Sequence, residues 1–123
     1  MDQSEMKART KSFALRAIRL VRALPKSIEG RVLGTQLIRA ATSVAANYRA
    51  ACRGRSRAEF TAKIGTVLEE ADESQLWLEL IVGAGLLTEK RCQPLLLEAG
   101  ELVAIMVSTR KSALAKQHLK SEI

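Results

Sequence analysis

The chain has 123 residues, of which 47% are apolar and only 3% aromatic, and its formal net charge is +7. This length favours a single domain, residues 1–123, with one core built from aliphatic side chains and alanine. Two prolines and seven glycines leave long uninterrupted stretches, which argues against a strand-and-turn architecture and favours long helices.

No apolar run approaches the roughly 18 residues that a membrane-spanning helix needs, so no membrane partner is expected. The first residues are charged and contain no apolar segment, which argues against a secretory leader. Cys52 and Cys92 are not in a paired or ligand-like spacing. We therefore expect both cysteines to be reduced thiols and the protein to be cytoplasmic.

The first helix is expected at about residues 10–24, where apolar side chains recur at helical spacing and arginines lie on the other side. Pro25 ends it, because proline disfavours helical geometry in the residue before it. A short connection follows, in which Gly30 is a natural helix breaker. The second helix, about residues 31–52, has an alanine-rich face that suits both helix formation and close approach of a partner helix.

Ser43 and Asn47 are four residues apart in the second helix and therefore point the same way. Asparagine is a poor helix former in mid-helix. We therefore expect Asn47 to make a tertiary hydrogen bond, across a helix or a subunit contact; a solvent-facing side chain is the alternative.

The turn after the second helix carries Gly54, which suits a left-handed cap. Ser56 and Glu59 have the spacing of a capping box that opens a third helix at about residues 57–82. Trp77 lies off the main apolar stripe of that helix. It indicates either a second contact surface for self-association or a side chain that covers the edge of a bundle.

The fourth helix is expected at about residues 89–116, with Thr88 as its N-cap and a fraying polar tail from residue 117 to residue 123. Pro94 should kink its first turns, or the helix starts later. Four amphipathic helices with three short links predict an all-α fold, an antiparallel up-down-up-down four-helix bundle.

Residue types that support catalysis are scarce. The single histidine, His118, lies in the tail, so neither a di-iron nor a zinc site can be built, and no cofactor is expected. Glu69 and Glu73 share a helix face, but nothing near them in sequence supplies a nucleophile, a phosphate loop or an orienting histidine. We expect them to be a solvated face or ion-pair partners of arginines, and the protein not to be an enzyme.

Charge is distributed unevenly along the chain. Residues 1–64 carry 14 basic and 4 acidic side chains, whereas residues 65–123 carry 6 and 9. The candidate residues for binding nucleic acid or a partner protein are Arg49, Arg53, Arg55, Arg57 and Lys63. They span the end of the second helix, the turn and the start of the third helix, so they should cluster in space. No aromatic residues are interleaved for base stacking, so binding through phosphates is expected to be weakly sequence-specific; a solvated or subunit-bridging charged face is the alternative.

A set of polar positions, together with the apolar periodicity, resembles the 23S rRNA intervening-sequence protein family of small bacterial four-helix bundles. The residues that carry the resemblance are the run QLIRAATSV at 36–44, Asn47, Arg55-Ser56, Glu59-Phe60, Glu70, Glu73 and Gly85-Leu86-Leu87. The polar positions expected to be structural are Arg39, Ser43, Asn47, Ser56, Glu59, Glu70 and Glu73. Where many members of the family have Glu-Gly after the asparagine, this chain has Ala50-Ala51.

The family is similar in fold to the accessory protein of diversity-generating retroelements, a pentameric barrel that binds nucleic acid and a reverse transcriptase. The resemblance therefore implies a non-enzymatic homo-oligomer, with a pentamer as its expected form. The function expected is that of a self-assembling bundle with a basic surface for RNA, DNA or a partner protein. The alternatives are a regulatory or toxin–antitoxin-like partner binder and an enzyme that uses the carboxylates of the third helix.

Overall fold

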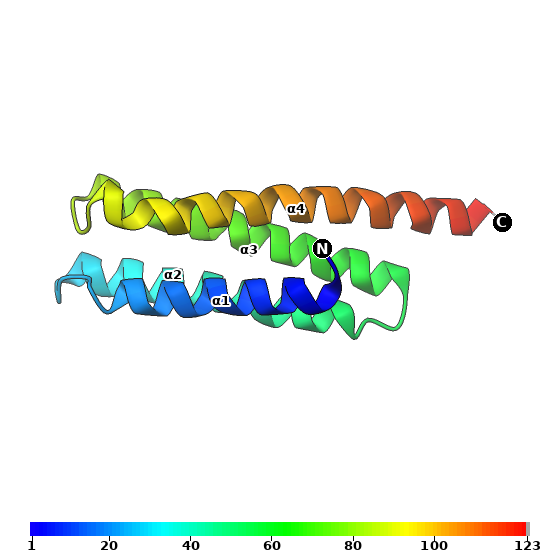
Figure 1. Cartoon of the computed structure of the whole chain (residues 1–123), viewed down its shortest axis with the longest axis horizontal. Helices are drawn as coiled ribbons and strands as arrows, with labels where there is room; N and C mark the ends of the chain where they lie inside the picture. The colour runs from blue at the N-terminus through cyan, green and yellow to red at the C-terminus, as the bar shows by residue number, and fades with distance from the viewer. Residues whose placement is uncertain (123) are drawn as a thin grey trace.

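The computed structural model describes the backbone of residues 1–122 and the side chains of residues 1–119. In that part of the chain there are four helices and no strand. The helices are α1 (Gln3–Val21), α2 (Ile28–Cys52), α3 (Arg57–Gly83) and α4 (Glu89–Glu122). Each packs along the next in the chain, and α4 touches α1 more lightly (Figure 1). The all-α prediction of a four-helix bundle is confirmed.

The first helix begins seven residues earlier than predicted, at Gln3. Asp2 caps it, because its carboxylate accepts a hydrogen bond of 2.8 Å from the backbone N–H of Glu5. The apolar stripe also continues backwards, since Met6 is buried. Thr10, the predicted start, is a buried residue whose hydroxyl donates to the Met6 carbonyl at 3.0 Å.

Gly30 does not act as a helix breaker, because it lies in the first turn of α2. Ser27 caps this helix by accepting a hydrogen bond of 3.1 Å from the Gly30 N–H. A Cβ at position 30 would lie 2.1 Å from the Pro25 carbonyl oxygen. The connection therefore folds tightly over the start of α2, and glycine is needed for close approach and not as a helix breaker.

The left-handed cap is at Gly85, whose φ is +73°, and not at Gly54. Leu86 N–H donates to the Ile81 carbonyl and Gly85 N–H to the Val82 carbonyl, which is the Schellman pattern. By contrast, α2 ends at Cys52 with Arg53 as its C-cap, whose φ is −99°. The predicted cap at Gly54 is therefore wrong.

Pro94 lies inside α4, which begins at Glu89. Thr88 caps this helix, because its hydroxyl accepts a hydrogen bond of 3.2 Å from the Arg91 N–H. Pro94 is exposed, so the carbonyl one turn earlier, which lacks its usual donor, can be hydrated. The suggested later start is thus wrong. The helix continues to Glu122, past the predicted end at residue 116, while Ile123 lies outside the described residues.

Contrary to the expectation that no segment could cross a membrane, Glu89–Leu119 of α4 is long and apolar enough by length and composition, because one 18-residue window within it has a mean hydropathy of 1.2. These two criteria are also met by core helices of soluble proteins. Only 28% of the apolar window is buried. The composition of α4 therefore points to an outer apolar face as well as a core face.

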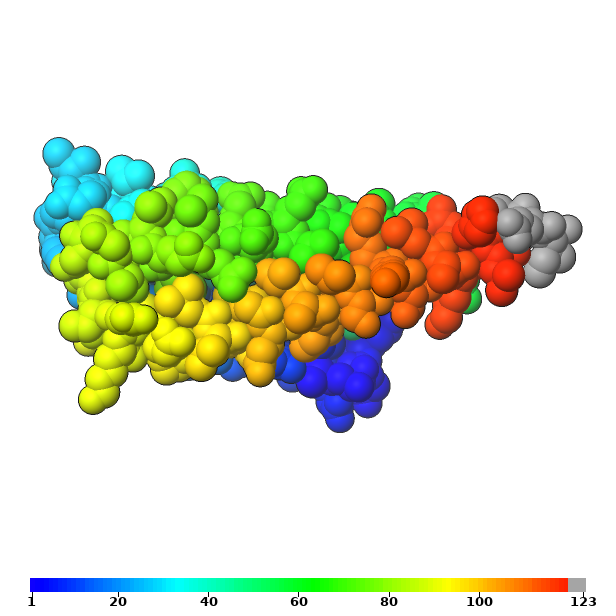
Figure 2. Space-filling view, turned by 90° about the horizontal axis from the view of Figure 1, so that it is seen from above, coloured from blue at the N-terminus to red at the C-terminus, as the bar shows by residue number. Residues whose placement is uncertain are grey.

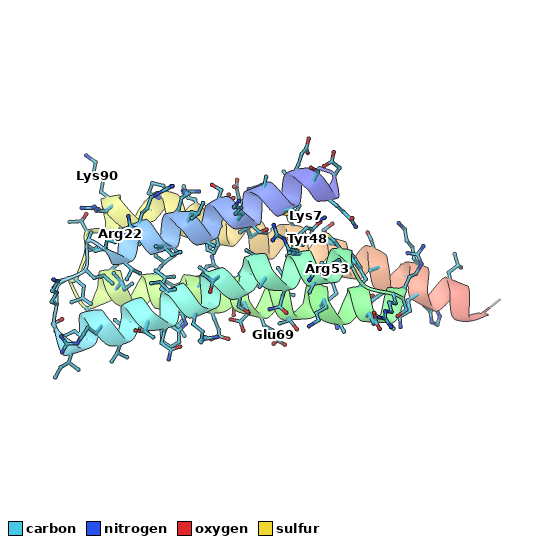
Figure 3. The ribbon with its side chains drawn as sticks, turned by 90° about the horizontal axis from the view of Figure 1, so that it is seen from below. Lys7, Arg22, Tyr48, Arg53, Glu69 and Lys90 are labelled. Atoms are coloured by element: carbon cyan, nitrogen blue, oxygen red, sulfur yellow. The ribbon has the colours of Figure 1, made fainter. Side chains whose placement is uncertain are left out.

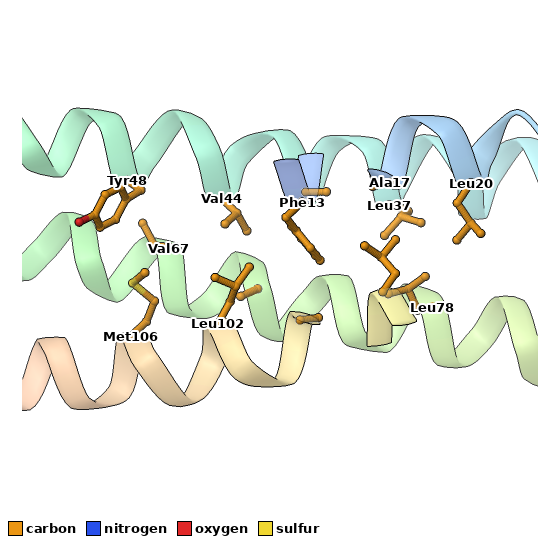
Figure 4. Packing of buried hydrophobic residues seen from close by; sticks show 14 of the residues in the cluster. Phe13, Ala17, Leu20, Leu37, Val44, Tyr48, Val67, Leu78, Leu102 and Met106 are labelled. Carbon is orange, nitrogen blue, oxygen red and sulfur yellow. The ribbon is translucent and has the colours of Figure 1, made fainter. Parts of the chain in front are cut away.

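Side chains from all four helices fill the core (Figure 4). Phe13 of α1 lies among residues of the other helices, Tyr48 of α2 is also buried, and most of the remaining large side chains are aliphatic. The largest fully buried side chains are Phe13, Leu37, Ile64, Leu78, Ile81, Leu102 and Met106. Trp77 is half-buried and packs against this cluster, although its indole Nε1 is enclosed and has no partner among the described residues.

The helices differ in length, with 34 residues in α4 and 19 in α1. At 1.5 Å per residue the difference is roughly 20 Å. The C-terminal part of α4 therefore extends past the start of α1 and past the α2–α3 turn (Figures 1 and 2). At this end of the bundle the first helix no longer covers α3 and α4.

Candidate functional site

The five cationic side chains singled out in the sequence are all exposed: Arg49, Arg53, Arg55, Arg57 and Lys63. None of the five is in an ion pair with another described residue, since the ion pairs formed there involve Arg9 and Arg39. Their charges are consequently available to an external anion.

Backbone geometry fixes the turn that carries them. Ser56 caps α3, and its Oγ accepts a hydrogen bond of 3.1 Å from Glu59 N–H. The Glu59 carboxylate in turn accepts one of 2.6 Å from the N–H of Arg55, one residue before the cap. The first bond is that of the predicted capping box, whereas the second reaches the N–H one residue before the one that the motif uses. Together the two bonds hold Arg55 and Arg57 on either side of the cap.

Three of the five cations line two separate hollows, while Arg53 and Lys63 line neither. Arg55 and Arg57 line a groove of about 690 Å³ that also includes Lys116 of α4. Arg49 instead lines a smaller hollow of about 320 Å³ together with Lys7 and Lys11 of α1. The five side chains therefore do not all line one hollow.

The added lysines lie far from the turn in sequence. The position of Lys116 follows from the antiparallel course of α3 and α4, which brings the end of one beside the start of the other (Figure 1). Lys7 was missed because α1 was predicted to begin after it. Figure 3 shows Lys7, Tyr48 and Arg53 toward the same end of the molecule, and Lys90 at the other.

The predicted structural polar residues Arg39, Glu70 and Glu73 meet at the α2–α3 contact. The Arg39 guanidinium is 3.2 Å from Glu70 Oε2 and 2.6 Å from Glu73 Oε1. Hydrogen bonding to Glu73 raises the pKa of Arg39. One carboxylate of the Glu69–Glu73 pair is thus engaged by an arginine, as the ion-pair interpretation expects.

Asn47 bonds within its own helix. Its Nδ2 donates to the Ser43 carbonyl at 3.0 Å and to the Ser43 Oγ at 2.8 Å. The expected bond across a helix is absent from the described residues, because Ser43, one turn earlier, already supplies both acceptors, one from its backbone and one from its side chain. Both side chains remain half-exposed.

Sequence reasoning missed the cluster of Arg9, Glu98 and Glu101, which links α1 to α4. Arg9 Nε and Nη2 donate to both oxygens of Glu98 at 2.7 and 2.8 Å, and Nη2 also reaches Glu101 at 2.7 Å. The Arg9 and Glu98 side chains are only 24% and 13% exposed. The hydrogen bonds from Arg9 hold the pKa of Glu98 below its usual value. Arg9 lies 89 positions from Glu98 and 92 from Glu101 in the chain, so no local pattern indicates the contact.

Replacing Glu98 with glutamine should lower the free energy of unfolding by about 1–2 kcal/mol at pH 7. Because the pKa of Glu98 is lower in the folded state, its contribution is present above the usual carboxyl pKa and is lost as pH falls through the folded value. Urea unfolding at pH 7 and pH 3 should therefore give a smaller difference between wild type and variant in acid. Glu101→Gln, at a side chain that is 65% exposed, is the matched control. An equal difference at both pH values would contradict this ion pair.

No group of three or more potential metal ligands occurs among the described residues. Cys92 is buried, and burial raises the pKa of its thiol; Cys52 is half-buried. Burial likewise raises the pKa of the Tyr48 hydroxyl. The raised pKa values make Cys92 and Tyr48 poor nucleophiles near neutral pH.

Comparison with known proteins agrees with this architecture. The family model described as 23S rRNA-intervening sequence protein matches residues 2–108. A crystal structure from Bacteroides thetaiotaomicron, described as a protein with unknown function from the S23 ribosomal protein family, has a TM-score of 0.83 and 30% identity. The alignment covers 90% of this chain and 99% of that one. No curated protein gives a significant match. The chain therefore belongs to the 23S rRNA-intervening sequence protein family.

Proposed function

We propose that this protein is a non-catalytic, self-assembling bundle that binds nucleic acid through phosphates at its cationic end. The observation that carries the proposal is the set of five exposed cations without ion-pair partners among the described residues. Lys116 of α4 lines the same hollow as Arg55 and Arg57. Lys7 and Lys11 of α1 line the same hollow as Arg49. Phosphate contacts require such free charges and little sequence readout.

Self-assembly is supported by apolar side chains on the outside of the last two helices. The exposed large residues there are Leu76, Leu80, Leu97, Val107, Leu114 and Leu119. Leu97 is 60% exposed, and burying such side chains against further copies would remove them from water. The family resemblance makes a pentamer the expected form. Sedimentation showing only monomer at micromolar concentration would contradict this part of the proposal.

A salt titration tests the binding part. Duplex DNA and RNA of random sequence should bind at low salt, and log affinity should fall linearly with log salt between about 50 and 200 mM. Arg53→Gln should weaken binding and reduce the slope by up to about 0.9 on DNA. Arg39→Gln removes the same charge from a residue already paired to carboxylates and serves as the control. No binding at the lowest salt would refute nucleic-acid binding and favour a partner protein instead.

A further inference from the structure

A continuous groove lies at the end of the bundle where α4 extends past α1. One part, of about 690 Å³, lies between the α2–α3 turn and α4. The other, of about 630 Å³, lies between the start of α1 and α4. The two parts share the lining residues Gln3, Phe60, Ser108 and Thr109, so they adjoin and make a groove with two chemically different halves.

The first half is cationic. Arg55, Arg57 and Lys116 line it, and the hydroxyls of Ser56 and Ser112 lie beside them. All three cations are exposed, and the lining of both halves contains no aspartate or glutamate. Such a surface suits the oxygens of a phosphodiester, which accept hydrogen bonds and carry negative charge.

The second half is mostly apolar and includes two of the four aromatic residues of the chain. Met6 and Tyr48 are nearly fully buried and line its interior, while Ile105 adds an aliphatic side. Phe60 is half-buried and lies at the junction of the two halves. An accessible aromatic side chain beside cations is the arrangement on which unpaired bases stack. The expectation that no aromatic side chain accompanies the cations is therefore wrong, because Phe60 also lines the cationic half of the groove.

We propose that this groove binds a segment of single-stranded nucleic acid, with phosphates on the cationic half and a base against Phe60 in the apolar half. This inference rests on the proposed function and makes its ligand narrower. A duplex keeps its bases stacked inside and offers mainly phosphates to such a groove, so it can use the cationic half alone. Charge complementarity selects a polyanion, and the apolar half selects one with exposed bases.

Phe60 provides the decisive variants. Phe60→Leu keeps an apolar side chain of similar size but removes the aromatic face, whereas Phe60→Tyr keeps that face. Fluorescence anisotropy should show Phe60→Leu binding a labelled single-stranded oligonucleotide roughly fivefold or more weakly, at an unchanged salt slope. Its affinity for a hairpin duplex of the same length should not change, and Phe60→Tyr should retain wild-type affinity for the single strand. Circular dichroism establishes that both variants are folded.

A charge variant tests the other half. The triple variant Arg55→Gln, Arg57→Gln and Lys116→Gln should reduce the salt slope for single strands by up to roughly 2, at about 0.7 per phosphate. The matched control removes three exposed cations at the other end of the bundle: Lys26→Gln, Arg31→Gln and Lys90→Gln. This control variant changes the net charge by the same amount as the groove variant, and it should retain most of the wild-type salt slope.

The outcomes separate this inference from the proposed function. Equal affinity for single strand and duplex, with no effect of Phe60→Leu, would overturn the groove assignment while phosphate binding stands. Displacement of the oligonucleotide by polyglutamate of equal charge and length would also overturn it, because that polymer has no bases. Absence of binding to either nucleic acid at low salt would overturn both.

Discussion

Replacing Phe13 with alanine should lower the free energy of unfolding by about 3–5 kcal/mol. Phe13 is fully buried and is the only phenylalanine in the core, where it lies among aliphatic side chains of the other helices (Figure 4). Its removal leaves a cavity that the small surrounding side chains cannot fill without moving helices. Because α1 is the shortest helix, it has few other large residues with which to hold its place.

Urea unfolding followed by circular dichroism measures this loss. Leu15→Ala on the same helix is the matched control, since Leu15 is 41% exposed. Its effect should stay below about 1 kcal/mol because little apolar area is removed from contact. Similar losses for the two variants would mean that α1 is not packed through Phe13.

Replacing Gly30 with alanine should destabilise the protein by about 1–3 kcal/mol, although alanine is the better helix former. Gly30 lies in the first turn of α2, and its new methyl group would lie 2.1 Å from the Pro25 carbonyl oxygen. The neighbour is backbone, so the connection between α1 and α2 must shift.

Gly83→Ala is the control, because nothing lies within 4 Å of the methyl group that it adds at the end of α3. Helix propensity alone should then make it neutral or stabilising by up to about 1 kcal/mol. The two substitutions are chemically identical, so opposite signs in the change of melting temperature identify steric contact as the cause. A stabilising Gly30→Ala would show that the connection is looser than described.

The fold could be predicted because apolar periodicity and capping are local properties of the sequence. Ser56 and Glu59 marked the start of α3 correctly, and Thr88 marked that of α4. The predicted start of α1 is too late, because the helix already begins after the Asp2 cap. The two glycine predictions were wrong because a glycine that opens a turn and one that admits a neighbouring carbonyl look the same in sequence.

The candidate site was predictable only in part. The exposed arginines of the α2–α3 turn follow from sequence, since neighbouring charges stay together in a short turn. The groove does not follow from the sequence, because it depends on how far α4 extends beyond α1 and on which side of the turn each arginine lies. Likewise, the ion pair of Arg9 with Glu98 joins positions that no periodic pattern connects.

The light contact between α1 and α4 has a consequence for folding. Apart from that seam, each helix packs on its immediate neighbour in the chain, so the contact order is low and three hairpins can form with short loops to close. The seam joins the two ends of the chain and carries the largest loop-closure entropy. It is therefore expected to form late along the folding pathway and to open early in partial unfolding, which would expose the interior first along the edge beside the groove.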